Sequence, residues 1–113
     1  MSRFFCFTVA VFLAAALVVP DSARADAALV ERGHAIAVNN CARCHAIGKI
    51  GASPNPKSPP FRTLSQKYPL SNLEEALSEG IVVGHEGSEM PQFRLDPAQI
   101  EAFLAYLGSV QEK

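Results

Sequence analysis

Apolar residues recur at helical spacing in a segment in the first half of the chain. Residues 26–40 place small and apolar side chains along one stripe and charged side chains on the other face, which predicts an amphipathic helix. Asp26 is a suitable N-cap for this helix. Gly33 lies in its middle, where glycine costs about 1 kcal/mol relative to alanine, so we expect a close helix crossing there. The stripe consists of Leu29, Gly33, Ile36, Ala37 and Asn40.

A second periodic segment lies near the C-terminus. Asp96 and Pro97 supply an acidic N-cap and a proline at the first helical position, and Gln99 is placed to complete a capping box. These features predict that the last helix begins at Pro97. Its apolar stripe consists of Ile100, Phe103, Leu104 and Leu107, with Tyr106 beside it.

The region between these two helices is less regular. Residues 46–60 are rich in proline and glycine and predict a loop, while residues 61–68 carry apolar side chains at helical spacing. A capping box at residues 71–74, followed by Gly80, predicts a further short helix. Residues 84–91 again predict a loop. The sequence therefore predicts one small, mainly α domain.

The N-terminal 25 residues have the features of a cleaved signal peptide. Arg3 provides a positive start, residues 4–19 are almost wholly apolar, and Ala23-Arg24-Ala25 places small residues before the expected cut. An uncleaved membrane anchor is the alternative, but an apolar run of 16 residues is short for a membrane span. We therefore expect export to the periplasm, leaving a domain of 88 residues, 26–113.

Composition and charge exclude several function classes. The formal net charge is −1 at pH 7 and no basic run is present, which argues against binding to nucleic acid. The sequence shows no Ser/His/Asp set and no glycine-rich phosphate loop, so we expect no enzymatic activity of its own. Cleavage of the leader would also remove Cys6 and leave two cysteines in the domain.

Those two cysteines belong to the motif Cys41-Ala42-Arg43-Cys44-His45, the attachment signature of c-type haem. On one helical turn, the two thiols can form thioethers with the vinyl groups of one porphyrin edge, and the histidine then serves as the proximal iron ligand. A zinc site would need four ligands, and a thioredoxin-like redox pair would need a preceding strand. The motif therefore predicts one covalent haem.

A sixth iron ligand has three candidates. Met90 precedes Pro91 in a predicted loop, and its flanking Glu89 makes a role as core filler less natural. His85 is the rival, and two histidine ligands would lower the reduction potential whereas a His/Met pair raises it. His34 lies on the entering helix, from which the far face of the haem is hard to reach. We favour Met90.

With these features the chain resembles the class I c-type cytochromes, particularly the small bacterial monohaem members. The resemblance covers essentially all of residues 26–113. It implies an all-α, small cytochrome c fold, with three to five short helices wrapped around one covalent haem and the N- and C-terminal helices crossing. The residues that carry the resemblance are Cys41, Cys44, His45, Pro59, Phe61, Met90, Pro91, Phe103 and Tyr106.

The resemblance also implies roles for individual residues. A proline carbonyl accepts a hydrogen bond from the proximal histidine in this family, and Pro59 is the best match for His45, with Pro60 as the alternative. Phe61 matches a haem-lining position. Candidates for contacts with the haem propionates are Tyr68 and Arg62.

Helix packing in the family implies a further pair. A small residue on the first helix faces an aromatic residue on the last, and Gly33 and Tyr106 match these positions. The chain departs from the family at Ala37, where an aromatic residue is common, and the stretch from Cys41 to Met90 is short compared with mitochondrial members. These departures imply a trimmed version with a more exposed haem edge.

We therefore expect a periplasmic one-electron carrier with His45 and Met90 as iron ligands, acting between redox partner proteins and not stably inserted in the membrane after cleavage. One alternative is a haem-c subunit of a periplasmic dehydrogenase or oxidase complex. Another is a haem sensor or weak peroxidase, if Met90 is not a ligand. The sequence does not identify the electron donor or the acceptor.

Overall fold

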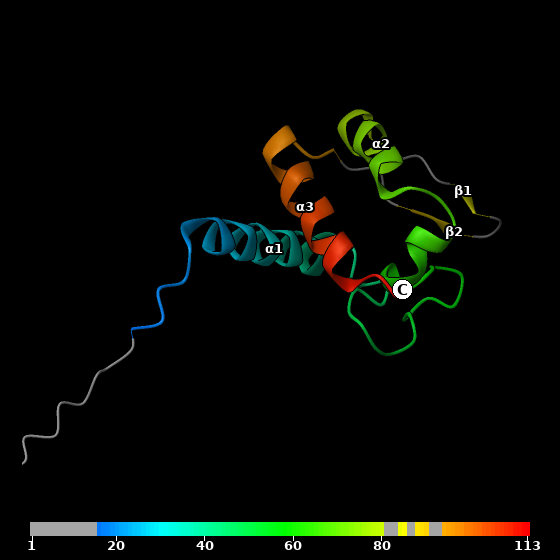
Figure 1. Cartoon of the computed structure of the whole chain (residues 1–113). Helices are drawn as coiled ribbons and strands as arrows, with labels where there is room; N and C mark the ends of the chain where they lie inside the picture. Colours follow the sequence, from blue (N-terminus) through cyan, green and yellow to red (C-terminus); the bar gives the residue numbers. More distant parts are fainter. Residues whose placement is uncertain (1–15, 81–83, 86–87, 91–93) are drawn as a thin grey trace, which may run out of the picture.

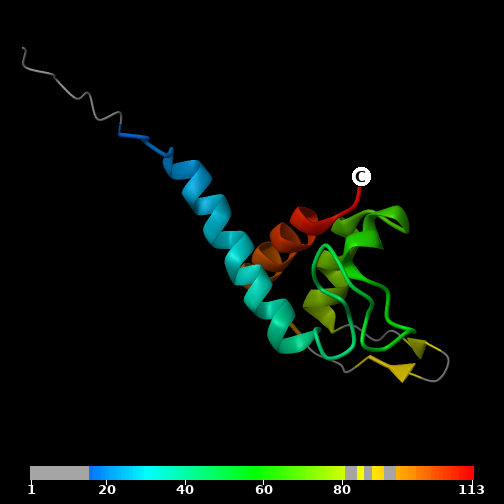
Figure 2. The same ribbon diagram turned by 90° about the horizontal axis from the view of Figure 1, so that it is seen from below.

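Two helices from opposite ends of the chain cross and form the centre of the fold (Figure 1). The computed structural model describes residues 16–80, 84–85, 88–90 and 94–113. Helix α1 (Asp21–Asn40) and helix α3 (Pro97–Val110) pack against each other, as both views show (Figures 1 and 2). This confirms the expected crossing of the first and last helices.

Gly33 lies at the crossing. A Cβ atom at this position would lie 2.6 Å from the Cβ of Tyr106 and even closer to the carbonyl oxygen of Ala102, so no side chain fits there. Tyr106 is buried, and its hydroxyl donates a hydrogen bond to the carbonyl of Ile47 at 2.8 Å. The pairing of Gly33 with Tyr106 is therefore confirmed, and it explains the unfavourable glycine within a helix.

The start of α1 differs from the prediction. The helix begins at Asp21 with Pro20 as N-cap, so the expectation that Asp26 caps it is wrong. Residues 21–28 are all exposed and project away from the rest of the molecule (Figure 2). Because alanine and arginine favour helix and Asp21 is well placed in the first turn, local preference extends the helix beyond its packed part.

The packed face of α1 is narrower than the predicted stripe. Gly33 and Ala37 are buried, and Leu29 and Ile36 are half-buried. Asn40 is exposed, and its side-chain amide donates to the carbonyl of Ile36 at 2.9 Å. The last residue of the stripe therefore caps the helix end instead of packing into the core.

The middle of the chain forms short helical pieces. The segment η1 (Phe61–Gln66) is a 3₁₀ helix, which realises the predicted helical spacing and buries Phe61 and Leu64. A second 3₁₀ turn, η2 (Leu70–Asn72), leads directly into helix α2 (Leu73–Glu79).

The boundaries of α2 were predicted in part. The predicted capping box at Ser71 is wrong, because Asn72 is the N-cap and makes no side-chain cap bond. The preceding 3₁₀ turn takes its place, since the N–H of Leu73 bonds back to the carbonyls of Leu70 and Ser71. Gly80 ends the helix with a φ of 102°, as its position predicted.

The predicted loop at residues 84–91 contains a small antiparallel pairing. Strand β1 (Gly84–His85) pairs with strand β2 (Ser88–Glu89), with Gly84 opposite Glu89. Two residues per strand add no layer to the fold, which remains helical. The segment 81–83, for which helix or strand was left open, lies outside the described residues, as does Pro91.

The predicted start of α3 is confirmed. The Asp96 side chain accepts from the N–H of Gln99 at 2.9 Å, and the Gln99 side chain accepts from the N–H of Asp96 at 3.0 Å, with Pro97 as the first helical residue. Among the described residues, no helix combines the length and the apolar character that a membrane span requires. The core cluster consists of Ala37, Cys41, Phe61, Leu64, Leu77, Leu95, Ile100, Phe103, Tyr106, Leu107 and Val110.

We expect Gly33→Ala to lower the free energy of unfolding by about 1–3 kcal/mol, because overpacking at the crossing outweighs the gain in helix propensity. Gly108→Ala is the matched control. Gly108 also lies in a helix, but nothing lies within 4 Å of a Cβ built there, so this change should stabilise the protein slightly. Urea unfolding followed by circular dichroism measures both. Equal stability of the two variants would contradict the crossing contact.

Candidate haem-binding site

A cavity of about 490 Å³ lies between α3, α2 and the segments that follow α1. Its lining is largely apolar and comes from positions spread over most of the folded chain. Such a volume and lining are typical of cofactor pockets. The apolar side chains that line it are Phe61, Leu64, Leu73, Leu77, Phe103 and Leu107.

The cavity brings together most of the residues singled out from the sequence. Cys41, His45, Pro59, Phe61 and Met90 all line it, although they span 50 positions of the chain. All five residues could therefore contact the same ligand in this cavity.

The two cysteines sit in the turn that ends α1. The N–H of Cys41 bonds to the carbonyl of Ala37 at 2.9 Å, and the N–H groups of Cys44 and His45 bond to the carbonyl of Cys41 at 3.1 and 2.9 Å. This turn continues the helical winding and places both cysteines next to the cavity histidine. Both thiols are free; Cys41 is buried and Cys44 half-buried.

The environments of the two thiols differ. Burial raises the pKa of Cys41 to about 11, so its thiol stays protonated at neutral pH. Cys41 lines the cavity, whereas Cys44 is not among the lining residues. Of the two thiols of the motif, only that of Cys41 therefore belongs to the cavity wall.

His45 is oriented by a backbone carbonyl. Its Nδ1 lies 2.8 Å from the carbonyl oxygen of Pro59. A carbonyl can only accept, so Nδ1 carries the hydrogen and donates it, which leaves the Nε2 lone pair free to bind a metal. The Nδ1 partner is thus the carbonyl of Pro59, while the carbonyl of Pro60 accepts from the hydroxyl of Thr63 at 2.9 Å.

Aromatic rings pack beside this histidine. The ring of Phe61 lies 5.1 Å from that of His45, centroid to centroid, and meets the ring of Phe103 edge-on at 5.8 Å. Contacts of this kind restrict the ring orientations available to the histidine. His45 is thus held both by its hydrogen bond and by packing.

The three candidates for the sixth ligand are placed differently. Met90 is half-buried and lines the cavity that contains His45. His34 is exposed on α1, where its ring lies 5.1 Å from that of Tyr106, and it does not line the cavity. The backbone of His85 belongs to β1, while its side chain lies outside the described part of the structure. Met90 is the candidate that this geometry brings to the cavity.

The two candidates for contacts with the haem propionates also differ in their position relative to the cavity. Tyr68 lines the cavity, and burial raises the pKa of its hydroxyl. Arg62 does not line it; its Nε donates to Glu112 Oε1 at 3.1 Å and its Nη1 donates to the carbonyl of Gly51 at 2.7 Å. The guanidinium is therefore engaged in holding the loop and the C-terminal tail.

Sequence reasoning missed several lining residues. Lys67 and Asn72 contribute polar groups, and no pattern in the sequence indicated them. Leu73 and Leu77 fall in the short helix predicted before Gly80, but they were not candidates for the site. A signal was available, because α2 and α3 each contribute an apolar pair four residues apart, Leu73 with Leu77 and Phe103 with Leu107.

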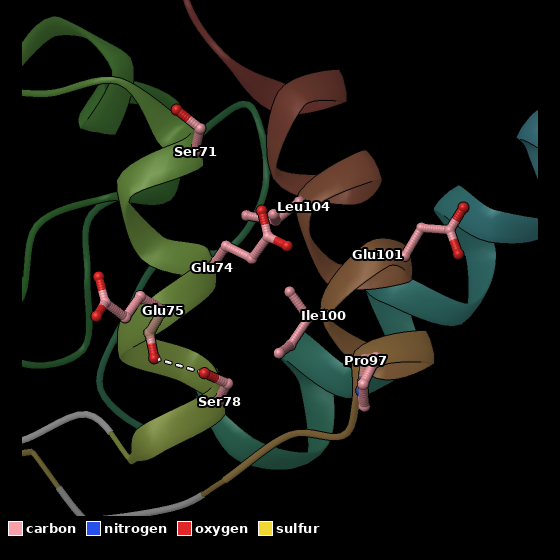
Figure 3. Close-up of a pocket in the computed structure, with 8 residues that line it drawn as sticks. All are labelled: Ser71, Glu74, Glu75, Ser78, Pro97, Ile100, Glu101 and Leu104. Atoms are coloured by element: carbon pink, nitrogen blue, oxygen red, sulfur yellow. Dashed lines mark hydrogen bonds between the residues drawn. The ribbon is translucent and has the colours of Figure 1, made fainter.

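A second hollow lies between α2 and α3 (Figure 3). Glu74, Glu75 and Glu101 line it together with the apolar Ile100 and Leu104, and none of its lining residues borders the first cavity. The two helices thus present different faces to two hollows. The described residues that line the second hollow include carboxylates but no cysteine or histidine, so this donor set does not suit a haem.

The residues of the first cavity suit a haem. The apolar walls match a porphyrin, a histidine nitrogen and a methionine sulfur are ligands that haem iron accepts, and two free cysteines are available for thioethers.

The family comparison agrees with this site. The sequence model of the family described as Cytochrome c matches residues 30–111, which include every residue that lines the cavity. No curated protein and no solved structure shows significant similarity to the chain. The chain therefore belongs to the cytochrome c family and is a class I c-type cytochrome, a carrier of electrons on covalently bound haem.

Proposed function

We propose that this protein is a periplasmic one-electron carrier with a single haem, attached through Cys41 and Cys44 and ligated by His45 and Met90. The observation that carries the proposal is the grouping of His45 and Met90 in one largely apolar cavity. The haem, when bound, supplies the exchange of one electron between Fe(III) and Fe(II). The chain supplies attachment, ligands and surroundings.

His45 is the proposed proximal ligand. The 2.8 Å contact of its Nδ1 with the Pro59 carbonyl selects the tautomer with a free Nε2 and makes that nitrogen a stronger donor. The ring of Phe61 lies beside the same ring, with their centroids 5.1 Å apart. Pro59 and Phe61 thus support the site without binding iron.

Met90 is the proposed sixth ligand. It lines the cavity from a segment 45 positions after His45. With His45 and Met90 both bound to the iron, no position would remain open for a substrate, which favours electron transfer over catalysis. Redox proteins are the expected partners.

Removal of residues 1–25 as a signal peptide fits the packing of α1. A cut after Ala25 would take away only exposed residues of this helix, because its buried and half-buried positions begin at Leu29. The helix crossing would be unaffected. Export is in turn consistent with haem attachment to cysteines outside the cytosol.

We expect Met90→Ala to retain covalent haem but to lose the weak near-red band of methionine-ligated ferric haem, and to bind imidazole or cyanide readily. The small side chain cannot reach the iron, which leaves a position open. Optical spectra of the oxidised protein measure both effects. Leu104→Ala is the control, because Leu104 lines the other hollow. A Met90→Ala spectrum identical to that of the wild type would contradict this ligand and favour His85 or an open site.

Replacement of either motif cysteine by alanine should impair covalent attachment, and the double variant should lose it, because no thiol remains to form a thioether. Haem staining after denaturing electrophoresis and the intact mass of the protein measure attachment. Cys6→Ala is the control and should attach haem normally, since Cys6 lies in the proposed leader. Stable covalent haem in the double variant would refute the attachment sites.

The exported protein should begin at Asp26, because the Ala23-Arg24-Ala25 sequence presents small residues to signal peptidase. N-terminal sequencing of the periplasmic fraction tests this. Ala25→Arg should block the cut and leave a membrane-associated precursor, whereas Ala28→Arg, three residues beyond the cut, should be processed normally. A mature protein that retains the apolar segment would show that the leader is an anchor.

A further inference from the structure

A single glutamine joins the end of α3 to the 3₁₀ helix η1. The Gln111 Nε2 donates to the carbonyl of Phe61 at 2.7 Å and to the carbonyl of Leu107 at 2.8 Å. Its Oε1 accepts from the backbone N–H of Ser65 at 2.8 Å. One side-chain amide therefore binds the first and fifth residues of η1 together with the last turn of α3.

The segment that Gln111 holds is a wall of the cavity. Phe61 and Leu64 are buried members of η1, and both line the cavity. The chain just before η1 contains Pro59, whose carbonyl accepts the hydrogen bond from His45. A bond to the Phe61 carbonyl thus fixes the backbone two residues beyond the group that orients the histidine.

We infer that Gln111 is a positioning residue for the haem site, which it serves by holding η1, and through η1 the Pro59 carbonyl and the Phe61 ring, against His45. This inference rests on the proposed function. A short 3₁₀ helix has poor internal hydrogen-bond geometry, so it depends on outside partners to keep its place. Gln111 supplies two such hydrogen bonds, to Phe61 and to Ser65. It directly follows the well-packed helix α3, which fixes its own position.

The chemistry of the side chain fits this role. The amide offers two N–H donors and a carbonyl acceptor, and the three bonds use all of these functions. Glutamate would keep the acceptor for Ser65 but lose both donors. The bond to Leu107 also satisfies one of the unpaired carbonyls at the end of α3, which is a helix-capping role distinct from positioning.

The test compares Gln111→Ala with Gln66→Ala in the reduced holoprotein by NMR hydrogen exchange. Gln66 is exposed at the end of η1, and its side chain forms no hydrogen bond with the described residues, so it is a matched control. In Gln111→Ala we expect the His45 Nδ1 proton and the Ser65 amide to exchange about tenfold faster, as the loss of local hydrogen bonds predicts. Amides at the α1–α3 crossing should change less than about twofold, and Gln66→Ala should change none of these rates.

Gln111→Glu distinguishes the effect of the Nε2 donors from that of the Oε1 acceptor. We expect it to keep the Ser65 amide protected while exchange at His45 accelerates, because the acceptor for Ser65 remains while the donors to Phe61 and Leu107 are lost. Unchanged exchange at His45 in Gln111→Ala would overturn the inference, as would an equal acceleration at the α1–α3 crossing, which indicates general destabilisation. Absence of covalent haem in the wild-type protein would instead contradict the proposed function itself.

Discussion

The close crossing of α1 and α3 is the contact on which the rest of the structure depends. Because Gly33 has no side chain, the backbones of the two helices approach each other directly. The crossing fixes the end of α1, where the N–H of Cys41 still bonds to the carbonyl of Ala37. It also fixes α3, which presents Phe103 to the cavity. This one helix contact therefore positions both the Cys41–His45 motif and the cavity wall that α3 provides.

The features predicted from the sequence have either a preference encoded within a few neighbouring residues or a counterpart in the family resemblance. The capping box at Asp96 and the stop at Gly80 depend on side-chain and backbone preferences within a few residues, and both are present. The pairing of Gly33 with Tyr106 is a long-range contact, and it was predictable because the family resemblance supplied the partner. The same resemblance predicted that His45, Pro59 and Met90 would lie together, and all three line one cavity.

The features that escaped prediction depend on contacts between distant segments or on competition between similar local signals. Ser71 fits a capping box, but a 3₁₀ turn supplies backbone bonds in its place. Arg62 matched a propionate contact, whereas Glu112, 50 positions away, engages it at 3.1 Å. Gln111 has no motif at all, and its three bonds exist only because α3 ends beside η1. Side-chain partners of this kind follow from the assembled fold.

Because the domain is small, a group bound in its central cavity contributes strongly to the stability of the fold. A chain of 113 residues buries a smaller share of its surface than a large protein, so a group that fills a central apolar cavity becomes part of its core. Any group that binds only the folded state stabilises that state by an amount that grows with the logarithm of its concentration. A covalent bond to the haem, as the cytochrome c family implies, replaces this concentration by a fixed, high effective value. Because Cys41 lies in the cavity wall, the proposed attachment there would couple haem binding to the stability of the fold.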